Sequence, residues 1–128
     1  MPTTKDSLKD RLARYREITI GVIGRKTGRK ISIPVWFVLE GSGTLYLMPV
    51  QGSDTQWYKN VLHNPTIRIS ARGKEGSFQG MPIADPDAVK HVVEAFRAKY
   101  GAADVKKYYS KFDVAVRVDL SRAERASG

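Results

Sequence analysis

Apolar and polar positions alternate along the first part of the chain in a way that predicts strands joined by short loops. Residues 17–23 and 31–40 are rich in β-branched side chains and predict two strands. Residues 24–30, with two glycines and four basic residues, predict a hairpin loop between them. A third strand is predicted over 44–50. Pro34 cannot donate a ladder hydrogen bond, so it predicts an edge or a bulge in the second strand.

Over residues 51–65 the spacing of apolar residues becomes helical, with Trp57 on the apolar face. Ser53 or Asp54 is the predicted N-cap of this helix, because their side-chain oxygens can accept from free backbone N–H groups. Asn64-Pro65 is predicted to end it, since the residue before a proline avoids helical geometry. This segment interrupts the strands and carries two adjacent large aromatic residues. We expect Trp57 in the core and Tyr58 half-exposed beside it, and a flat binding surface is the alternative.

The second half of the chain returns to alternation around one long helix. Asp85 and Pro86 predict a helix start, with Asp as N-cap and Pro in the first turn. Gly101 predicts its end, and a short helix follows over 103–111. Strands are predicted over 66–72, 75–84 and 113–120.

Six short strands with mostly antiparallel connections close most economically into a small barrel, which leaves no exposed sheet edge. The predicted fold class is therefore α+β, a six-stranded antiparallel barrel with flanking helices. Residues 17–120 form this domain. Residues 1–16 are predicted as a basic amphipathic helix, and residues 121–128 as a frayed tail.

The net charge of +9 is the unusual feature of the composition. A field of this sign attracts anions, which include nucleic acids, membrane surfaces and phosphorylated small molecules. The chain has no cysteine, and its two histidines are far apart, so we predict no metal site. It has no apolar run of the ~20 residues that a spanning helix needs and no signal-peptide pattern, which predicts a cytoplasmic protein. The N-terminal helix offers a peripheral membrane contact.

Two kinds of candidate binding residue emerge from the pattern. The basic loop, residues 24–30, carries Arg25 and Lys26 and is either an anion site or a solvated hairpin tip. Trp36 and Phe37 are adjacent in a strand, so one is expected in the core and the other at a cleft. Tyr108 and Tyr109 are candidate proton donors beside such a cleft, and helix packing is the alternative for both.

These segments together resemble the deazaflavin-dependent nitroreductase family. The motifs are G-R-K-T-G at 24–28 with the strand proline at 34, and W-Y-K-N at 57–60 with N-P at 64–65. The resemblance covers residues 17–72 and implies a split β-barrel related to pyridoxamine-phosphate-oxidase-like flavin enzymes. It implies coenzyme F420, a deazaflavin with a phosphate and an acidic tail.

The resemblance also implies an activity and a set of site residues. The activity is hydride transfer from the reduced coenzyme to an electron-poor acceptor such as a quinone, a nitroaromatic or an enone. Tyr108, Tyr109 or water would supply the proton, and a homodimer is expected by analogy. The coenzyme would contact Arg25, Lys26, Thr27, Gly28, Pro34, Trp36, Val50, Gln51, Gly52, Trp57, Tyr58 and Asn60.

The chain departs from the family at two places on the phosphate side. Val50, Gln51, Gly52 and Ser53 stand where the family usually has Ser-Lys-Gly-Gly, and Ile31 stands where it usually has arginine. FMN or another small ligand in a non-catalytic barrel therefore remains an alternative to F420. A basic barrel that binds single-stranded nucleic acid is a further alternative, although no alternating basic and aromatic strand pattern supports it.

Overall fold

The computed structural model describes residues 17–40, 43–71 and 74–120. The predicted basic helix over 1–16 and the predicted tail over 121–128 lie outside these residues. The membrane contact that the helix would make therefore stays a prediction.

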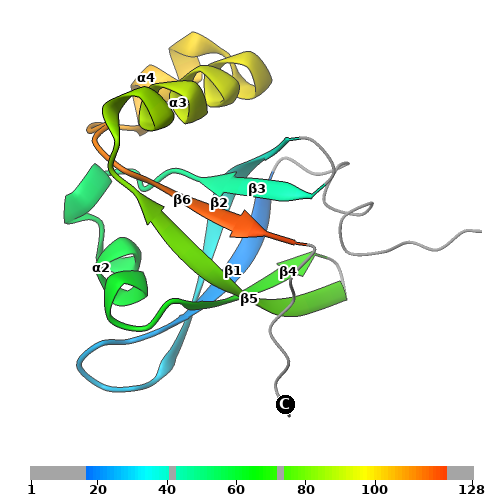
Figure 1. Cartoon of the computed structure of the whole chain (residues 1–128), viewed down its shortest axis with the longest axis vertical. Coiled ribbons are helices and arrows are strands. Elements are labelled where there is room, and N and C mark those ends of the chain that lie inside the picture. Colours follow the sequence, from blue (N-terminus) through cyan, green and yellow to red (C-terminus); the bar gives the residue numbers. More distant parts are fainter. Residues whose placement is uncertain (1–16, 41–42, 72–73, 121–128) are drawn as a thin grey trace, which may run out of the picture.

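The strands form one closed antiparallel barrel, as predicted (Figure 1). Their order around it is β1-β2-β3-β6-β5-β4. The third strand ends earlier than expected, at Leu47, because Pro49 has no N–H with which to extend the ladder. The strands are β1 (Glu17–Ile23), β2 (Lys30–Glu40), β3 (Thr44–Leu47), β4 (Thr66–Ala71), β5 (Lys74–Ile83) and β6 (Ala115–Asp119).

Two strands bend from one sheet into the other and so close the barrel. Residues 30–36 of β2 pair with β1, and residues 37–40 pair with β3. In the same way, β5 pairs with β4 up to Gln79 and with β6 from Gly80 onward. Pro34 lies in the part of β2 that pairs with β1 alone among the described strands, so it stands at an edge of the paired segment, as predicted.

The helices of the described residues follow from their local sequences, with one correction. They are a single 3-10 turn, η1 (Gly52–Asp54), followed by α2 (Gln56–His63), α3 (Pro86–Tyr100) and α4 (Ala102–Tyr108). Asp85 caps α3 as predicted by accepting from Ala88 N at 3.0 Å. Gly101, with φ of +96°, ends that helix.

The predicted N-cap of α2 is wrong. Ser53 and Asp54 lie in the 3-10 turn, and the helix begins two residues later, after Thr55. The reason is tertiary: Ser53 donates its hydroxyl to Asp113 at 2.6 Å, and Asp54 accepts from Lys111 at 3.1 Å. Both side chains are therefore bonded to the segment that follows α4.

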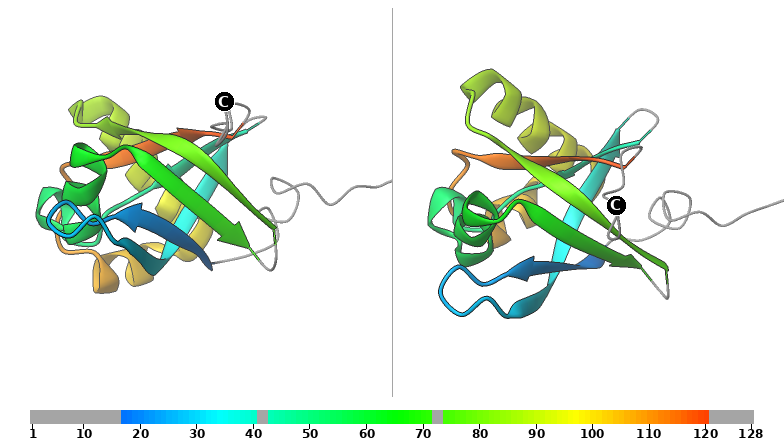
Figure 2. Two further views of the ribbon diagram at one scale, coloured as in Figure 1. Left: turned by 90° about the horizontal axis from the view of Figure 1, so that it is seen from below. Right: turned by 60° about the horizontal axis from the view of Figure 1, so that its bottom comes forward.

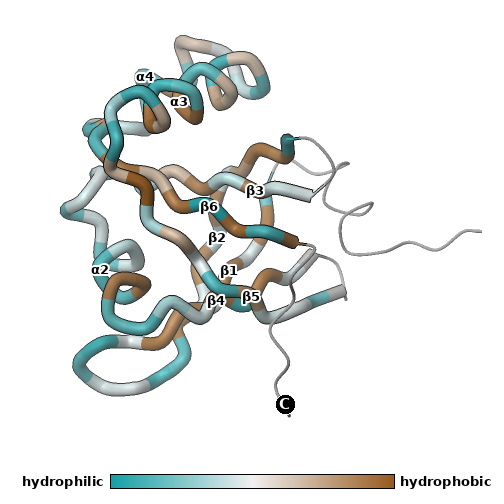
Figure 3. Tube along the Cα trace, in the orientation of Figure 1, coloured by the Kyte–Doolittle hydropathy of each residue, from teal (hydrophilic) through white to brown (hydrophobic). Residues whose placement is uncertain are grey.

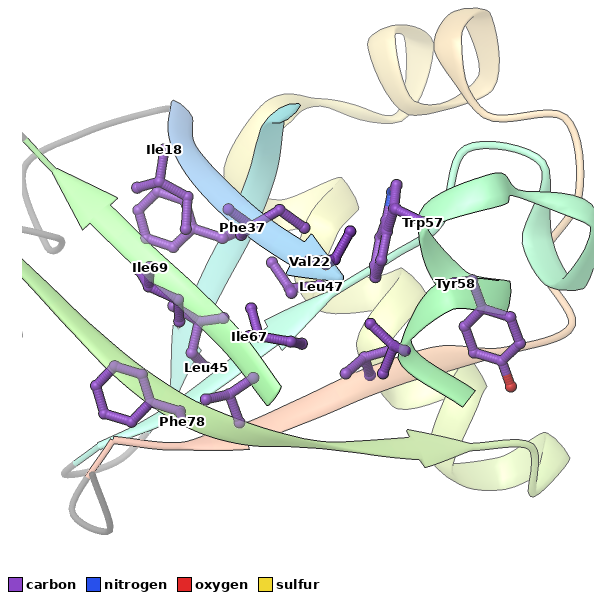
Figure 4. Packing of buried hydrophobic residues seen from close by; sticks show 14 of the residues in the cluster. Ile18, Val22, Phe37, Leu45, Leu47, Trp57, Tyr58, Ile67, Ile69 and Phe78 are labelled. Atoms are coloured by element: carbon purple, nitrogen blue, oxygen red, sulfur yellow. The ribbon is translucent and has the colours of Figure 1, made fainter. Parts of the chain in front are cut away.

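Two apolar clusters hold the molecule together, and hydrophobic positions recur along the strands and along α3 (Figure 3). Figure 4 shows side chains of the first cluster. One fills the barrel and includes Phe37, Leu45 and Ile69, each fully buried. The other joins α3 and α4 to the outer face of the barrel, through residues such as Val92 and Phe96. In the described part of the chain, no helix combines the length and the apolar character needed to cross a membrane.

Candidate functional site

A pocket of about 470 Å³ opens where β2, the segment after β3, the start of α2 and the end of α4 meet. We call it the aromatic pocket. Its walls are mainly flat or apolar side chains. Six of the sequence-predicted site residues line it: Pro34, Trp36, Val50, Trp57, Tyr108 and Tyr109.

Strand alternation places one large aromatic ring of β2 in the core and the next one at the pocket, as expected. Phe37 points into the barrel and is fully buried. Trp36 points outward and stacks on Tyr100, with ring centroids 4.2 Å apart and an interplanar angle of 10°. Tyr100 is itself fixed, because its hydroxyl donates to Phe37 O at 2.8 Å. The tryptophan wall of the pocket is therefore rigidly backed.

The segment after β3 is joined to the segment after α4, and this brings Val50 and the two tyrosines together. Ser110 N donates to Val50 O at 2.9 Å. Gly52 has φ of +56°, and a Cβ there would lie 2.1 Å from an Asp113 carboxylate oxygen. A side chain at position 52 would collide with this carboxylate, so glycine is required there. The hydrogen bonds that Ser53 donates to Asp113 lower the pKa of the Asp113 carboxyl group.

The basic loop is a compact turn that closes on itself. Gly24 N donates to Arg29 O, and Gly28 N donates to Gly24 O, each at 2.8 Å. Thr27 Oγ1 accepts from Arg29 N at 3.2 Å. Gly28 has φ of +73°, which the turn requires. The two glycine N–H groups are therefore used within the loop, so its anion-binding capacity lies in the Arg and Lys side chains.

Helix α2 lies beside the basic loop (Figures 1 and 2), and it also contributes to the lining of the pocket. Arg25 donates from its guanidinium to Asn60 Oδ1 and to Gln56 Oε1, both at 2.8 Å, and its backbone N donates to Asn60 Oδ1 at 3.1 Å. These acceptors are neutral amides, so they orient the guanidinium without cancelling its charge. The same helix presents Trp57 to the pocket.

The structure does not bring every predicted site residue to the pocket. Gln51 and Gly52 lie in the connection to the segment after α4, where Gln51 forms a β-bridge with Lys111. Tyr58 lies in the barrel cluster and points away from Trp57 (Figure 4). We expected a half-exposed Tyr58, and this was wrong, since only 5% of it is exposed. Burial and the charge of Asp113 raise its pKa.

The two candidate proton donors differ in their environments. Tyr108 is half-exposed at the pocket, whereas Tyr109 is buried. Burial, and to a smaller extent Tyr100, raises the pKa of Tyr109, which therefore stays protonated at neutral pH. Tyr108 is the more accessible of the two hydroxyls.

Sequence reasoning missed several residues of the site. Glu17 and Thr55 line the pocket, and Gln56 holds Arg25. Glu17 lies opposite Trp36 in the β1–β2 register, so a hairpin register drawn from the sequence would have placed it there. Among the described residues, no group of three or more acidic or histidine side chains lies close enough to hold a metal ion.

A family model matches residues 9–118, and its description is "uncharacterized protein conserved in bacteria (DUF2255)". The chain belongs to this family. No curated protein matches it.

Solved structures establish the split β-barrel fold of this DUF2255 protein. An F420-H2 dependent reductase is 20% identical, with a TM-score of 0.62 over 81% of this chain and 94% of that one. A putative 5-nitroimidazole antibiotic resistance protein from Bacteroides thetaiotaomicron is 14% identical, with a TM-score of 0.69 over 94% and 81% of the two chains. The heme storage protein HutZ from Vibrio cholerae is 10% identical, with a TM-score of 0.69 over 93% and 89%. Because these neighbours carry different chemistries, function must be argued from the site itself.

Proposed function

We propose that this protein is an oxidoreductase that binds coenzyme F420 and reduces an electron-poor acceptor, such as a quinone, a nitroaromatic or an enone. The observation that carries the proposal is that one helix, α2, contacts the basic loop and also lines the aromatic pocket. Arg25 is held by Gln56 and Asn60, and Trp57, on the same helix, lines the pocket. A coenzyme with a flat ring and a polyanionic tail needs both surfaces next to each other.

The dimensions and chemistry of the site fit such a coenzyme. A volume of about 470 Å³ lies within the range of small-molecule sites. Trp36 and Pro34 offer apolar walls for a ring, and Arg25 has five N–H donors, of which two side-chain bonds use only part. Lys26 is exposed in the same loop and adds a movable charge for phosphate or carboxylate groups.

When bound, the coenzyme supplies the hydride, and the protein supplies position and environment. The stacked Trp36 and the buried Trp57 keep water from the inner wall of the pocket. Tyr108, half-exposed in the pocket lining, would donate a proton to an acceptor that needs one. Tyr109, which is buried, would serve as a neutral wall of the pocket.

A parallel titration with F420 and FMN, followed by fluorescence at physiological salt, tests the proposal. The wild-type protein should bind F420 in preference to FMN. The double substitution Arg25→Ala and Lys26→Ala should weaken F420 binding roughly 30-fold, because two charge-assisted contacts are lost. Arg97→Ala is the matched control, since Arg97 is exposed on α3 and pairs with Glu94.

Each result has a definite meaning. If the protein prefers FMN, then FMN replaces F420 as the proposed coenzyme, and the proposed oxidoreductase activity stands. Binding of neither, or an unchanged affinity in the double variant, would refute the assignment of the loop and pocket to a coenzyme.

We further propose that the protein forms a homodimer. A structure described as a domain-swapped dimer shares the fold, with 20% identity and a TM-score of 0.63 over 81% of this chain and 80% of that one. Val50 and Tyr108 leave apolar surface exposed at the pocket mouth, which a second subunit could cover. Light scattering on the purified protein should give a mass near twice 14.3 kDa, and a monomeric mass would refute this.

A further inference from the structure

The charge of the aromatic pocket is opposite to the charge of the protein. The chain carries 22 Lys and Arg residues and a net charge of +9. Among the described residues that line the pocket, none is Lys or Arg, and the single formal charge is the carboxylate of Glu17. Glu17 is exposed and takes part in no ion pair between described residues. No described residue neutralises its negative charge.

The rings around this carboxylate favour a positive ligand for a second reason. The face of an aromatic ring is electron-rich and attracts cations, with Trp the strongest. The rings of Tyr108 and Tyr109 lie beside the Trp36 ring. Their centroids are 5.6 and 5.9 Å from the Trp36 centroid. Trp36 cannot turn its ring freely, because its other face stacks on Tyr100.

The pocket also shows this interaction within the chain itself. Lys107 Nζ lies 5.3 Å from the centroid of the Tyr108 ring. An ammonium group thus already lies over one of the rings that line the pocket, although Lys107 itself is not a lining residue. The Lys107 ammonium would also compete with a cationic ligand for this ring, so removing it should strengthen cation binding.

We propose that the aromatic pocket selects an organic cation, a flat or quaternary ammonium compound whose charge lies between Glu17 and the faces of Trp36 and its neighbouring rings. The binding preference is independent of any coenzyme.

The test uses the full chain without coenzyme and three probes of one shape. N-methylquinolinium is the cation, methylquinoline the neutral compound and quinoline carboxylate the anion, measured by calorimetry at a pH where quinoline is neutral. The cation should bind about tenfold more tightly than the neutral probe, and the anion more weakly than both. Glu17→Gln should remove most of this preference. Glu94→Gln, the matched control on α3, should leave it unchanged.

A second variant keeps the test decisive. Lys107→Gln should tighten cation binding a few-fold, because it removes the competing ammonium without touching the pocket carboxylate. Equal affinity for cation and neutral probe, tighter binding of the anion, or an unaltered preference in Glu17→Gln would overturn the proposal. Failure of the F420 and FMN titration with the cation preference intact would refute the proposed function alone, and the reverse pattern would refute this inference alone.

Discussion

Asn60→Ala should destabilise the protein and loosen the basic loop in one step. Asn60 is the buried polar residue of the described core, with 4% of its surface exposed. Its Oδ1 accepts from the backbone N of Arg25 at 3.1 Å and from the guanidinium at 2.8 Å. Alanine removes this shared acceptor and leaves the two partly buried Arg25 donors without it.

The magnitude follows from these two bonds. A neutral hydrogen bond contributes about 1 kcal/mol and one to a charged group about 1.5–3 kcal/mol, so the expected loss is about 2.5–4 kcal/mol. For a domain of this size, that corresponds to a fall in Tm of roughly 8–16 °C. The affinity for a polyanionic ligand should fall as well, because Arg25 is no longer oriented.

Urea unfolding followed by circular dichroism measures the loss, and Gln56→Ala is the matched control. Gln56 also accepts from Arg25 at 2.8 Å, but this bond is exposed, so its removal should cost less than about 1 kcal/mol. If Asn60→Ala costs no more than Gln56→Ala, burial does not strengthen the Arg25 contact, and our account of how the loop is held is wrong.

Three further predictions concern other parts of the structure. Gly80→Ala should cost about 1–3 kcal/mol in chemical unfolding, because its Cβ would lie 2.6 Å from the buried Ile67 Cδ1; a neutral effect would show that this corner can relax. The raised pKa of Tyr109 means that the unfolded state loses its phenol proton first above pH 10.0, so stability falls as pH rises, and Tyr109→Phe should move alkaline unfolding to higher pH. An unmoved midpoint would exclude that contribution. Asp85→Ala should lower the free energy of unfolding by about 1 kcal/mol through loss of the α3 N-cap, with Asp85→Ser recovering most of it.

Local sequence was sufficient to predict most of the fold. Alternation of β-branched residues identified the strands, because a barrel wall buries one face of each strand and exposes the other. Asp85, Pro86 and Gly101 marked α3 correctly, because caps act on backbone groups only a few residues away. The placement of Trp36 and Phe37 on opposite faces of their strand followed from the two-residue period of a strand alone.

The errors arose where distant segments compete for the same side chain. Ser53 is a good N-cap by composition, yet Asp113, 60 residues later, accepts its hydroxyl hydrogen bond. Tyr58 was expected to be half-exposed and is buried in the barrel cluster. No local pattern contains these partners, so single-sequence reasoning could not choose them.

The sequence by itself determined the elements, the basic loop and the aromatic residues from which a site could be built. Only the tertiary structure decided how they combine: that Arg25 is held by Asn60, that Tyr108 and Trp36 share one pocket, and that Glu17 is its single formal charge among the described lining. The physical reason is range. Periodicity and caps act within one or two turns of chain, whereas a pocket is formed by residues that closure of the barrel brings together from opposite ends of the sequence.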